Sequence, residues 1–152
     1  MHLKDYISNV DKKYSKIFFS GISFNTSKIK KDNIFFAIKG NNLDGNDYIE
    51  DAIRKGAKVI ISEKKIIKKR KNIVYLQYSN IRKLLAEISY KILHKKPKKL
   101  IAVTGTNGKS SVADFYYQIL NLSNKKVASI GTLGIKSKKY KKVASQIHMQ
   151  KI

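Results

Sequence analysis

Apolar and polar positions follow two different spacings along the first hundred residues. Apolar residues three or four positions apart predict helices over residues 3–10, from Ile49 to a stop at Gly56, and over 80–95. Runs rich in Ile, Phe and Val predict β-strands over residues 17–24, 34–38, 58–62 and 73–78. Two glycines in the polar stretch 40–47 predict a turn. This mixture predicts a small α/β domain.

The pattern changes around Pro97, the single proline of the chain. The basic stretch 94–99 ends the preceding helix and is typical of a linker, so we expect one domain over 1–97 and a second over 98–152. After the linker, the apolar run 100–103 predicts a buried strand, 112–120 a helix and 126–130 another strand. Residues 100–131 therefore predict a β–loop–α–β unit with parallel strands.

A glycine-rich loop lies between the predicted strand and the predicted helix. Its residues are Gly105, Thr106, Asn107, Gly108, Lys109, Ser110 and Ser111. The strict phosphate-loop pattern requires a further glycine five positions before Gly108, where this chain has Val103. The physical parts remain, because a strand enters a glycine turn whose N–H groups and following helix N-terminus can hold phosphate. The alternative is an ordinary glycine turn that happens to precede a lysine.

We expect this loop to bind ATP. In that interpretation all seven loop residues contact the nucleotide. Lys109 is the catalytic group that reaches the β- and γ-phosphates, and the Ser110 hydroxyl is a ligand of Mg²⁺.

The net charge of the chain favours an anionic partner but does not identify which one. The chain carries 33 Lys and Arg against 10 Asp and Glu, a formal net charge of +23. Such a balance attracts nucleic acid or other polyanions. However, Arg54, Arg70 and Arg82 are its arginines, and nucleic-acid readout leans on arginine. Nucleic acid is therefore the less favoured partner, while a phosphorylated small ligand suits the positive field.

Composition also excludes several classes of protein. The absence of cysteine excludes disulfides, thiolate catalysis and Cys-ligated metal sites. His2, His94 and His148 lie too far apart to suggest a local metal motif. No apolar run reaches the ~20 residues of a membrane span, and Asp5 interrupts any signal-peptide pattern. These features predict a cytoplasmic location.

Three stretches resemble the Mur ligases. Residues 103–111 resemble the family's variant phosphate loop, which also lacks the first Walker glycine, and folylpolyglutamate synthetases share a similar loop. Residues 24–61 resemble the family's N-terminal domain, in which a strand, a glycine and an Asp-Gly pair precede a helix ending in Gly-Ala. Residues 131–134 (GTLG) resemble a Gly-Thr-x-Gly motif of the tripeptide-forming members. Those members are therefore the most similar.

The resemblance implies a fold, an activity and a set of contacts. It implies a small UDP-sugar-binding α/β domain followed by the start of a P-loop-type parallel-sheet ATPase domain. It implies ATP- and Mg²⁺-dependent addition of a diamino acid to UDP-MurNAc-L-Ala-D-Glu through an acyl phosphate, in peptidoglycan synthesis. By position, the residues that would contact the UDP-sugar are Phe24, Thr26, Asn41, Asn42 and Leu43. Asp44 and Gly45 are interpreted as turn-forming.

Departures from the family pattern limit what this chain is expected to do. Asn25 and Ser27 stand where the family has an acid and an arginine. Family members are several times longer, and the Thr-Thr-Pro-type substrate motif expected after Gly134 is not found. Asp114 is expected to face outward and is not assigned a magnesium role. We therefore expect a fragment that is inactive as a ligase by itself.

Three alternatives stay open at this point. The chain could be a fragment of the final Mur ligase, which adds D-Ala-D-Ala. It could be a basic α/β module that binds nucleic acid, or a remnant without activity.

Overall fold

The structure is a computed structural model of the whole chain that describes residues 1–67, 70–138 and 141–142. The chain divides into two compact units, Met1–Lys96 and Pro97–Lys151. The division falls beside the proline of the expected linker. Part of the second domain that we expect over 98–152, namely residues 139–140 and 143–152, lies outside the described residues.

Four parallel strands form the sheet of the first unit, in the order β1–β2–β3–β4. They are β1 (Gly21–Ser23), β2 (Asn33–Ala37), β3 (Ala57–Ser62) and β4 (Val74–Gln77). Every residue of β2 is buried, and so is nearly all of β3. This burial explains the continuous apolar runs in the sequence, since strands that are covered on both faces do not alternate.

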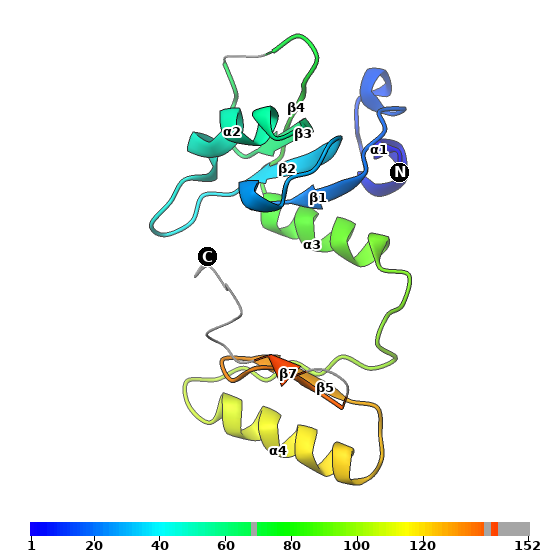
Figure 1. Cartoon of the computed structure of the whole chain (residues 1–152), viewed down its shortest axis with the longest axis vertical. Helices are drawn as coiled ribbons and strands as arrows, with labels where there is room; N and C mark the ends of the chain where they lie inside the picture. The colour runs from blue at the N-terminus through cyan, green and yellow to red at the C-terminus, as the bar shows by residue number, and fades with distance from the viewer. Residues whose placement is uncertain (68–69, 139–140, 143–152) are drawn as a thin grey trace. The chain divides into compact units, whose positions relative to one another are not determined.

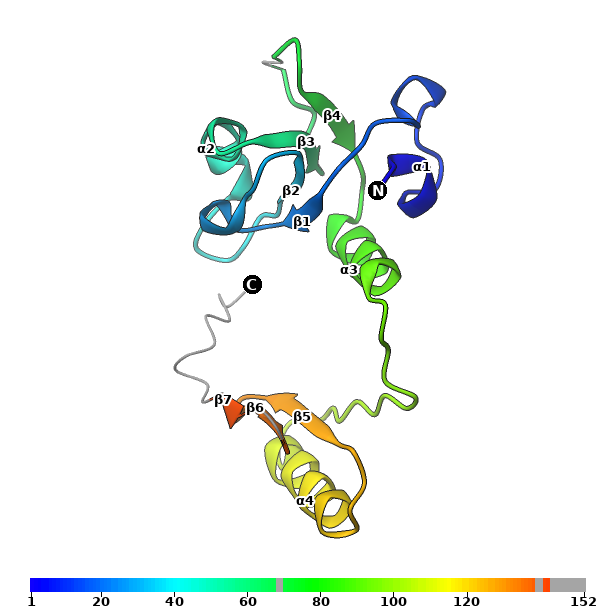
Figure 2. The ribbon, with the colours of Figure 1, turned by 45° about the vertical axis from the view of Figure 1, so that its right-hand side comes forward.

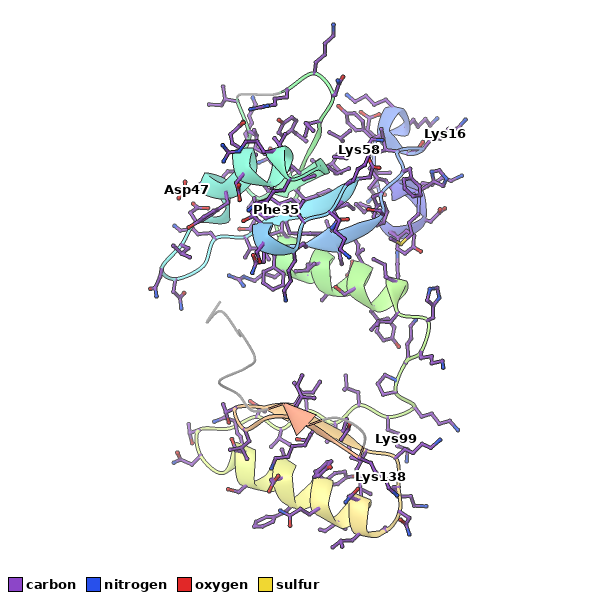
Figure 3. All side chains as sticks on the ribbon, in the orientation of Figure 1. Lys16, Phe35, Asp47, Lys58, Lys99 and Lys138 are labelled. Carbon is purple, nitrogen blue, oxygen red and sulfur yellow. The ribbon has the colours of Figure 1, made fainter. Side chains whose placement is uncertain are left out.

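Helices cover both faces of this sheet (Figure 1). One face packs against α1 (Leu3–Tyr6) and α3 (Ile81–Ile92), and the core there contains Phe36 and Ile88. The opposite face packs against α2 (Ile49–Arg54), with Phe35 in the core (Figure 3). Short 3₁₀ helices complete the unit at Lys12–Tyr14, Thr26–Lys28 and Gly45–Tyr48.

The element predictions for the first unit are confirmed in type and order, but several elements are shorter, such as the helix predicted over 80–95, which ends at Ile92. The strand predicted over 17–24 is reduced to β1, because Phe18 forms only an isolated bridge with His2. The opening helix predicted over 3–10 ends at Tyr6. The predicted stop at Gly56 is confirmed, because its φ of 105° lies in the left-handed region that ends helices.

The described residues of the second unit form one helix on a small antiparallel sheet (Figure 2). Helix α4 (Lys109–Leu122) packs on the hairpin formed by β5 (Ala128–Gly131) and β6 (Gly134–Ser137). Strand β7 (Lys141–Lys142) extends the sheet on the far side of β6. Thr132 and Leu133 form the turn between β5 and β6.

The mixed α/β class is confirmed, but the expected parallel β–loop–α–β unit is wrong for the described part of the second unit. Residues 100–103 form no strand and are exposed, with 87% of Leu100 accessible to solvent. The strand over 126–130 is confirmed with a small shift, yet its partner is antiparallel β6. An apolar run supplies strand propensity, whereas a strand also requires a neighbour to hydrogen-bond with.

Candidate functional site

The loop at 105–111 has the backbone that a phosphate loop needs. Gly105 and Gly108 have φ of 140° and 73°, a region that residues with a side chain rarely adopt. Gly108 is the N-cap of α4, and no side chain caps the helix there. The first backbone N–H groups of α4 therefore have no partner within the helix and can donate hydrogen bonds to an anion.

Lys109 brings a positive charge to the same loop. Its ammonium donates hydrogen bonds to the backbone carbonyls of Gly105 and Thr106, the latter at 2.8 Å. Within the described part of the chain, no carboxylate lies within ion-pair distance of Lys109. Because carbonyls carry no net charge, the loop retains an uncompensated positive charge.

Ser110 contacts a residue that sequence analysis did not assign to this site. Its Oγ lies 2.7 Å from the Oγ1 of Thr132, in the turn between β5 and β6. The same turn, the start of α4 and Gly134 of β6 line a shallow pocket. The motif at 131–134 was the available signal, but nothing in its spacing placed it beside the loop.

The acidic residue of α4 is engaged, and the prediction that it faces outward is wrong. Asp114 is only 22% exposed and forms an ion pair with Lys136 of β6. Gln118 donates a hydrogen bond to its other oxygen at 2.7 Å. The hydrogen bond from Lys136, followed by that from Gln118, lowers the pKa of the Asp114 carboxyl. The residues that the structure describes contain no cluster of three His, Cys, Asp or Glu side chains able to hold a metal ion.

This set of groups fits a nucleotide phosphate with Mg²⁺. Uncapped backbone N–H groups and the Lys109 ammonium suit phosphate oxygens, and the Ser110 hydroxyl suits a hard cation. Gly108 leaves the mouth of the loop open, since a Cβ added there would meet no atom within 4 Å.

The residues expected to contact a UDP-sugar follow β1 and β2, so they lie at the carboxyl edge of the parallel sheet. Phe24 directly follows β1 and is 44% exposed. Asn41, Asn42 and Leu43 are exposed in the loop after β2, and Leu43 is 56% exposed. Ligands of open α/β sheets bind at this edge.

Thr26 lies in the 3₁₀ helix after Phe24 and is partly engaged by the protein. Two hydrogen bonds lower the pKa of the Asp51 carboxyl. The one from the Lys55 side chain has the larger effect, and the one from the Thr26 side chain comes second. A ligand at Thr26 would therefore share this hydroxyl with Asp51.

A network of polar contacts holds the loop after β2. Its backbone closes through a hydrogen bond from the Gly40 N–H to the Leu43 carbonyl at 2.8 Å. Arg82 of α3 donates to the Lys39 carbonyl at 2.7 Å. Lys64, just after β3, pairs with Asp44 at 2.7 Å.

Asp44 and Gly45 are confirmed as turn-forming residues. The Asp44 carboxylate accepts a hydrogen bond from the Asn46 N–H at 3.0 Å and caps the 3₁₀ helix Gly45–Tyr48. The hydrogen bond from Lys64 and then that from the Asn46 N–H lower the pKa of Asp44 from 3.8 to about 2. Buried Ser62 also donates to the Asn46 side-chain carbonyl at 2.6 Å.

Comparison with known families gives one match in each unit. Residues 19–93 match the profile described as "Mur ligase family, catalytic domain". Residues 103–152 match the "Mur ligase middle domain". The chain belongs to the Mur ligase family. The resemblance of residues 24–61 and 103–111 is therefore confirmed.

The curated relatives of the chain include several that are named UDP-N-acetylmuramoyl-L-alanyl-D-glutamate–2,6-diaminopimelate ligase. The Rickettsia prowazekii protein is 42% identical over 67 residues, which is 44% of this chain and 14% of the relative. The Fusobacterium nucleatum protein is 40% identical over 87 residues, 57% of this chain and 16% of the relative. The Clostridium tetani protein is 45% identical over 67 residues, 43% of this chain and 14% of the relative. The chain thus matches only a small part of each relative.

Solved Mur ligase structures share the fold. One is the structure of a UDP-N-acetylmuramoyl-L-alanyl-D-glutamate–2,6-diaminopimelate ligase, which matches this chain with a TM-score of 0.75 and 21% identity. The match covers 96% of this chain and 30% of that ligase. The MurF ligase of Thermotoga maritima, crystallised with ADP, matches with a TM-score of 0.52 and 28% identity. This match covers 69% of this chain and 23% of MurF.

No helix within the described ranges is long and apolar enough to cross a membrane.

Proposed function

We propose that this Mur ligase chain supplies the UDP-sugar-binding and ATP-binding parts of an ATP-dependent ligase. The reaction is the addition of a diamino acid to UDP-MurNAc-L-Ala-D-Glu in peptidoglycan synthesis. The observation that carries the proposal is the loop at 105–111, where a lysine with no acidic partner among the described residues meets an uncapped helix N-terminus. The printed names of the curated relatives support the choice of substrate.

At the loop, the chain's own groups bind and orient the triphosphate. The N–H groups of the first turn of α4 donate to phosphate oxygens. Lys109 exchanges its two carbonyl partners for the β- and γ-phosphates and stabilises negative charge on the phosphoryl group as it is transferred. Ser110 would hold Mg²⁺, which offsets phosphate charge when bound. The substrate carboxylate receives the phosphoryl group, and the incoming amine displaces phosphate from the acyl phosphate.

The carboxyl edge of the first unit is the proposed UDP-sugar site. Phe24 offers an exposed aromatic ring, and Asn41 and Asn42 offer amide donors and acceptors. These groups can contact a base and a ribose. Thr26 and Leu43 complete the proposed contacts. Use of ATP and a UDP-sugar together places the reaction in the cytoplasm.

Separate titrations of the full chain with MgATP and with UDP-MurNAc-L-Ala-D-Glu test both sites. Lys109→Ala should weaken MgATP binding by about 10- to 100-fold, because hydrogen bonds to charged groups contribute ~1.5–3 kcal/mol. The same variant should leave UDP-sugar binding unchanged. Asn42→Ala should show the opposite pattern.

The matched control is Lys125→Ala, which removes a lysine just after α4 and should change neither affinity. Equal MgATP affinity in the unchanged chain and in Lys109→Ala would overturn the ATP site. If Lys125→Ala weakens MgATP binding as much as Lys109→Ala does, the binding reflects attraction to the net charge alone.

A further inference from the structure

The hydroxyl pair between Ser110 and Thr132 joins two elements far apart in sequence. Ser110 belongs to the first turn of α4, and Thr132 lies in the turn between β5 and β6. Their oxygens are 2.7 Å apart, which is an ordinary hydroxyl–hydroxyl hydrogen bond. Either atom can be the donor in this pair.

Binding of a cation would select one of the two directions. A serine hydroxyl has one proton and two lone pairs. When a lone pair of Ser110 faces a cation, its proton must point elsewhere, since a proton aimed at the cation would be repelled. Thr132 Oγ1 is placed to accept that proton, which leaves the lone pairs of Ser110 free for the cation.

We infer that Thr132 is a positioning residue for the cation-bound nucleotide, acting by orienting the Ser110 hydroxyl. The inference rests on the proposed ATP site. It extends that site from the loop to the β5–β6 turn. The inference adds that the loop prefers Mg²⁺-bound to metal-free nucleotide, and that this preference depends on the hydroxyl of Thr132.

The neighbouring groups support this direction of the hydrogen bond. The Asp114 carboxylate lines the same pocket, and its hydrogen bonds come from Lys136 and Gln118. The side-chain hydrogen bond that the structure gives to the Ser110 hydroxyl is the one with Thr132. The turn itself is held by the pairing of Gly131 with Gly134 on either side of it.

The test measures binding of a non-hydrolysable ATP analogue to the full chain, with Mg²⁺ and with EDTA. Thr132→Val keeps the shape of the side chain and removes its hydroxyl. It should weaken binding about 5-fold with Mg²⁺, the effect of one hydrogen bond of ~1 kcal/mol, and leave binding in EDTA unchanged. Thr132→Ser should restore the Mg²⁺-dependent affinity. In a chain that already carries Ser110→Ala, Thr132→Val should cause no further loss of affinity.

Ser123→Ala is the control, because Ser123 also carries a hydroxyl that bonds within the second unit, at the far end of α4. It should not change the Mg²⁺ dependence.

Three results would overturn the inference while the ATP site stands. These are unchanged Mg²⁺-dependent affinity in Thr132→Val, an equal loss with and without Mg²⁺, and failure of Thr132→Ser to restore affinity. If the unchanged chain binds no nucleotide under either condition, the proposed function itself fails.

Discussion

Gly45 is a residue whose identity is imposed by its surroundings. A Cβ added there would lie 2.6 Å from both the backbone N and the backbone O of Ile38. The Ile38 carbonyl accepts a hydrogen bond from the Gly45 N–H at 2.9 Å, and the Ile38 N–H donates to the Phe36 carbonyl at 3.0 Å, so moving either atom disturbs a hydrogen bond. The Asp-Gly pair of the sequence therefore marks a close approach of two chain segments.

Gly45→Ala should lower the free energy of unfolding of the first unit by about 1–3 kcal/mol, the usual cost of overpacking. Urea unfolding followed by circular dichroism measures this change. Gly21→Ala is the control, because the atom nearest to its added Cβ is a side-chain atom, the Oδ1 of Asn33, and it lies at 3.2 Å rather than 2.6 Å. An equal loss in both variants would contradict the explanation.

Asp44 gives the first unit an acid-sensitive contact. Its pKa in the folded protein is about 2, below the ordinary 3.8, because Lys64 and the Asn46 N–H hydrogen-bond to the ionised form. A lowered carboxyl pKa stabilises the fold above the unfolded value, and this contribution disappears as the pH falls from about 4 towards 2.

Asp44→Asn removes the charge and retains a side chain that can cap the 3₁₀ helix. We expect the unchanged chain to exceed this variant in unfolding free energy at pH 6, and the difference to shrink steadily down to pH 2. Unfolding curves of both proteins across this range measure it. A difference that stays constant with pH would contradict the role of the Asp44–Lys64 pair.

At the scale of elements, two helices with similar apolar stripes are used differently. In α3 the stripe is buried, with Ile88 inaccessible to solvent. In α4 the expected stripe is exposed, and Ile119 is 62% accessible. The half-buried residues of α4 are Ser110, Ala113, Asp114, Tyr117 and Leu120.

Ile88→Ala should therefore lower the unfolding free energy of its unit by about 2–5 kcal/mol. The matched substitution Ile119→Ala should change that of its own unit by less than ~0.5 kcal/mol. Urea titrations that follow NMR signals from each unit separately measure both effects. A cost at Ile119 as large as that at Ile88 would show that the α4 stripe is covered.

Sequence predicted most of the first unit because its two signals agree there. Continuous apolar runs and glycine stops coincide with strands and helix ends, as at Gly56. The glycine-rich turn at 105–108 was predictable for the same reason, since Gly105 and Gly108 both adopt positive φ.

Contacts between distant segments could not be predicted from local pattern. The 100–103 run lacks a strand neighbour among the described residues, and neither the Asp114–Lys136 pair nor the Ser110–Thr132 pair follows from spacing. Each depends on where the β5–β6 hairpin meets α4. Hydrophobic periodicity also gives the apolar side of a helix without saying whether anything covers it.

At the scale of the whole molecule, charge and site geometry make different predictions. A net charge of +23 attracts any polyanion, and that attraction falls steeply with salt. The ATP site proposed at 105–111 would instead bind through a fixed set of donors, so its affinity should depend on Lys109 and largely survive at physiological ionic strength. Lysines such as Lys16 and Lys99 lie on the outside of their units (Figure 3) and should matter little to it.

The most direct test of the account is an NMR titration of the isotope-labelled full chain with MgATP at about 150 mM salt, where exposed charges are screened beyond ~8 Å. We predict saturable shifts confined to the signals of residues 105–111 and of Thr132, and in Lys109→Ala the same shifts should require about 10- to 100-fold more MgATP. Shifts spread over exposed lysines of both units, or none at the loop, would contradict the assignment of this chain as the ATP-binding part of a Mur ligase.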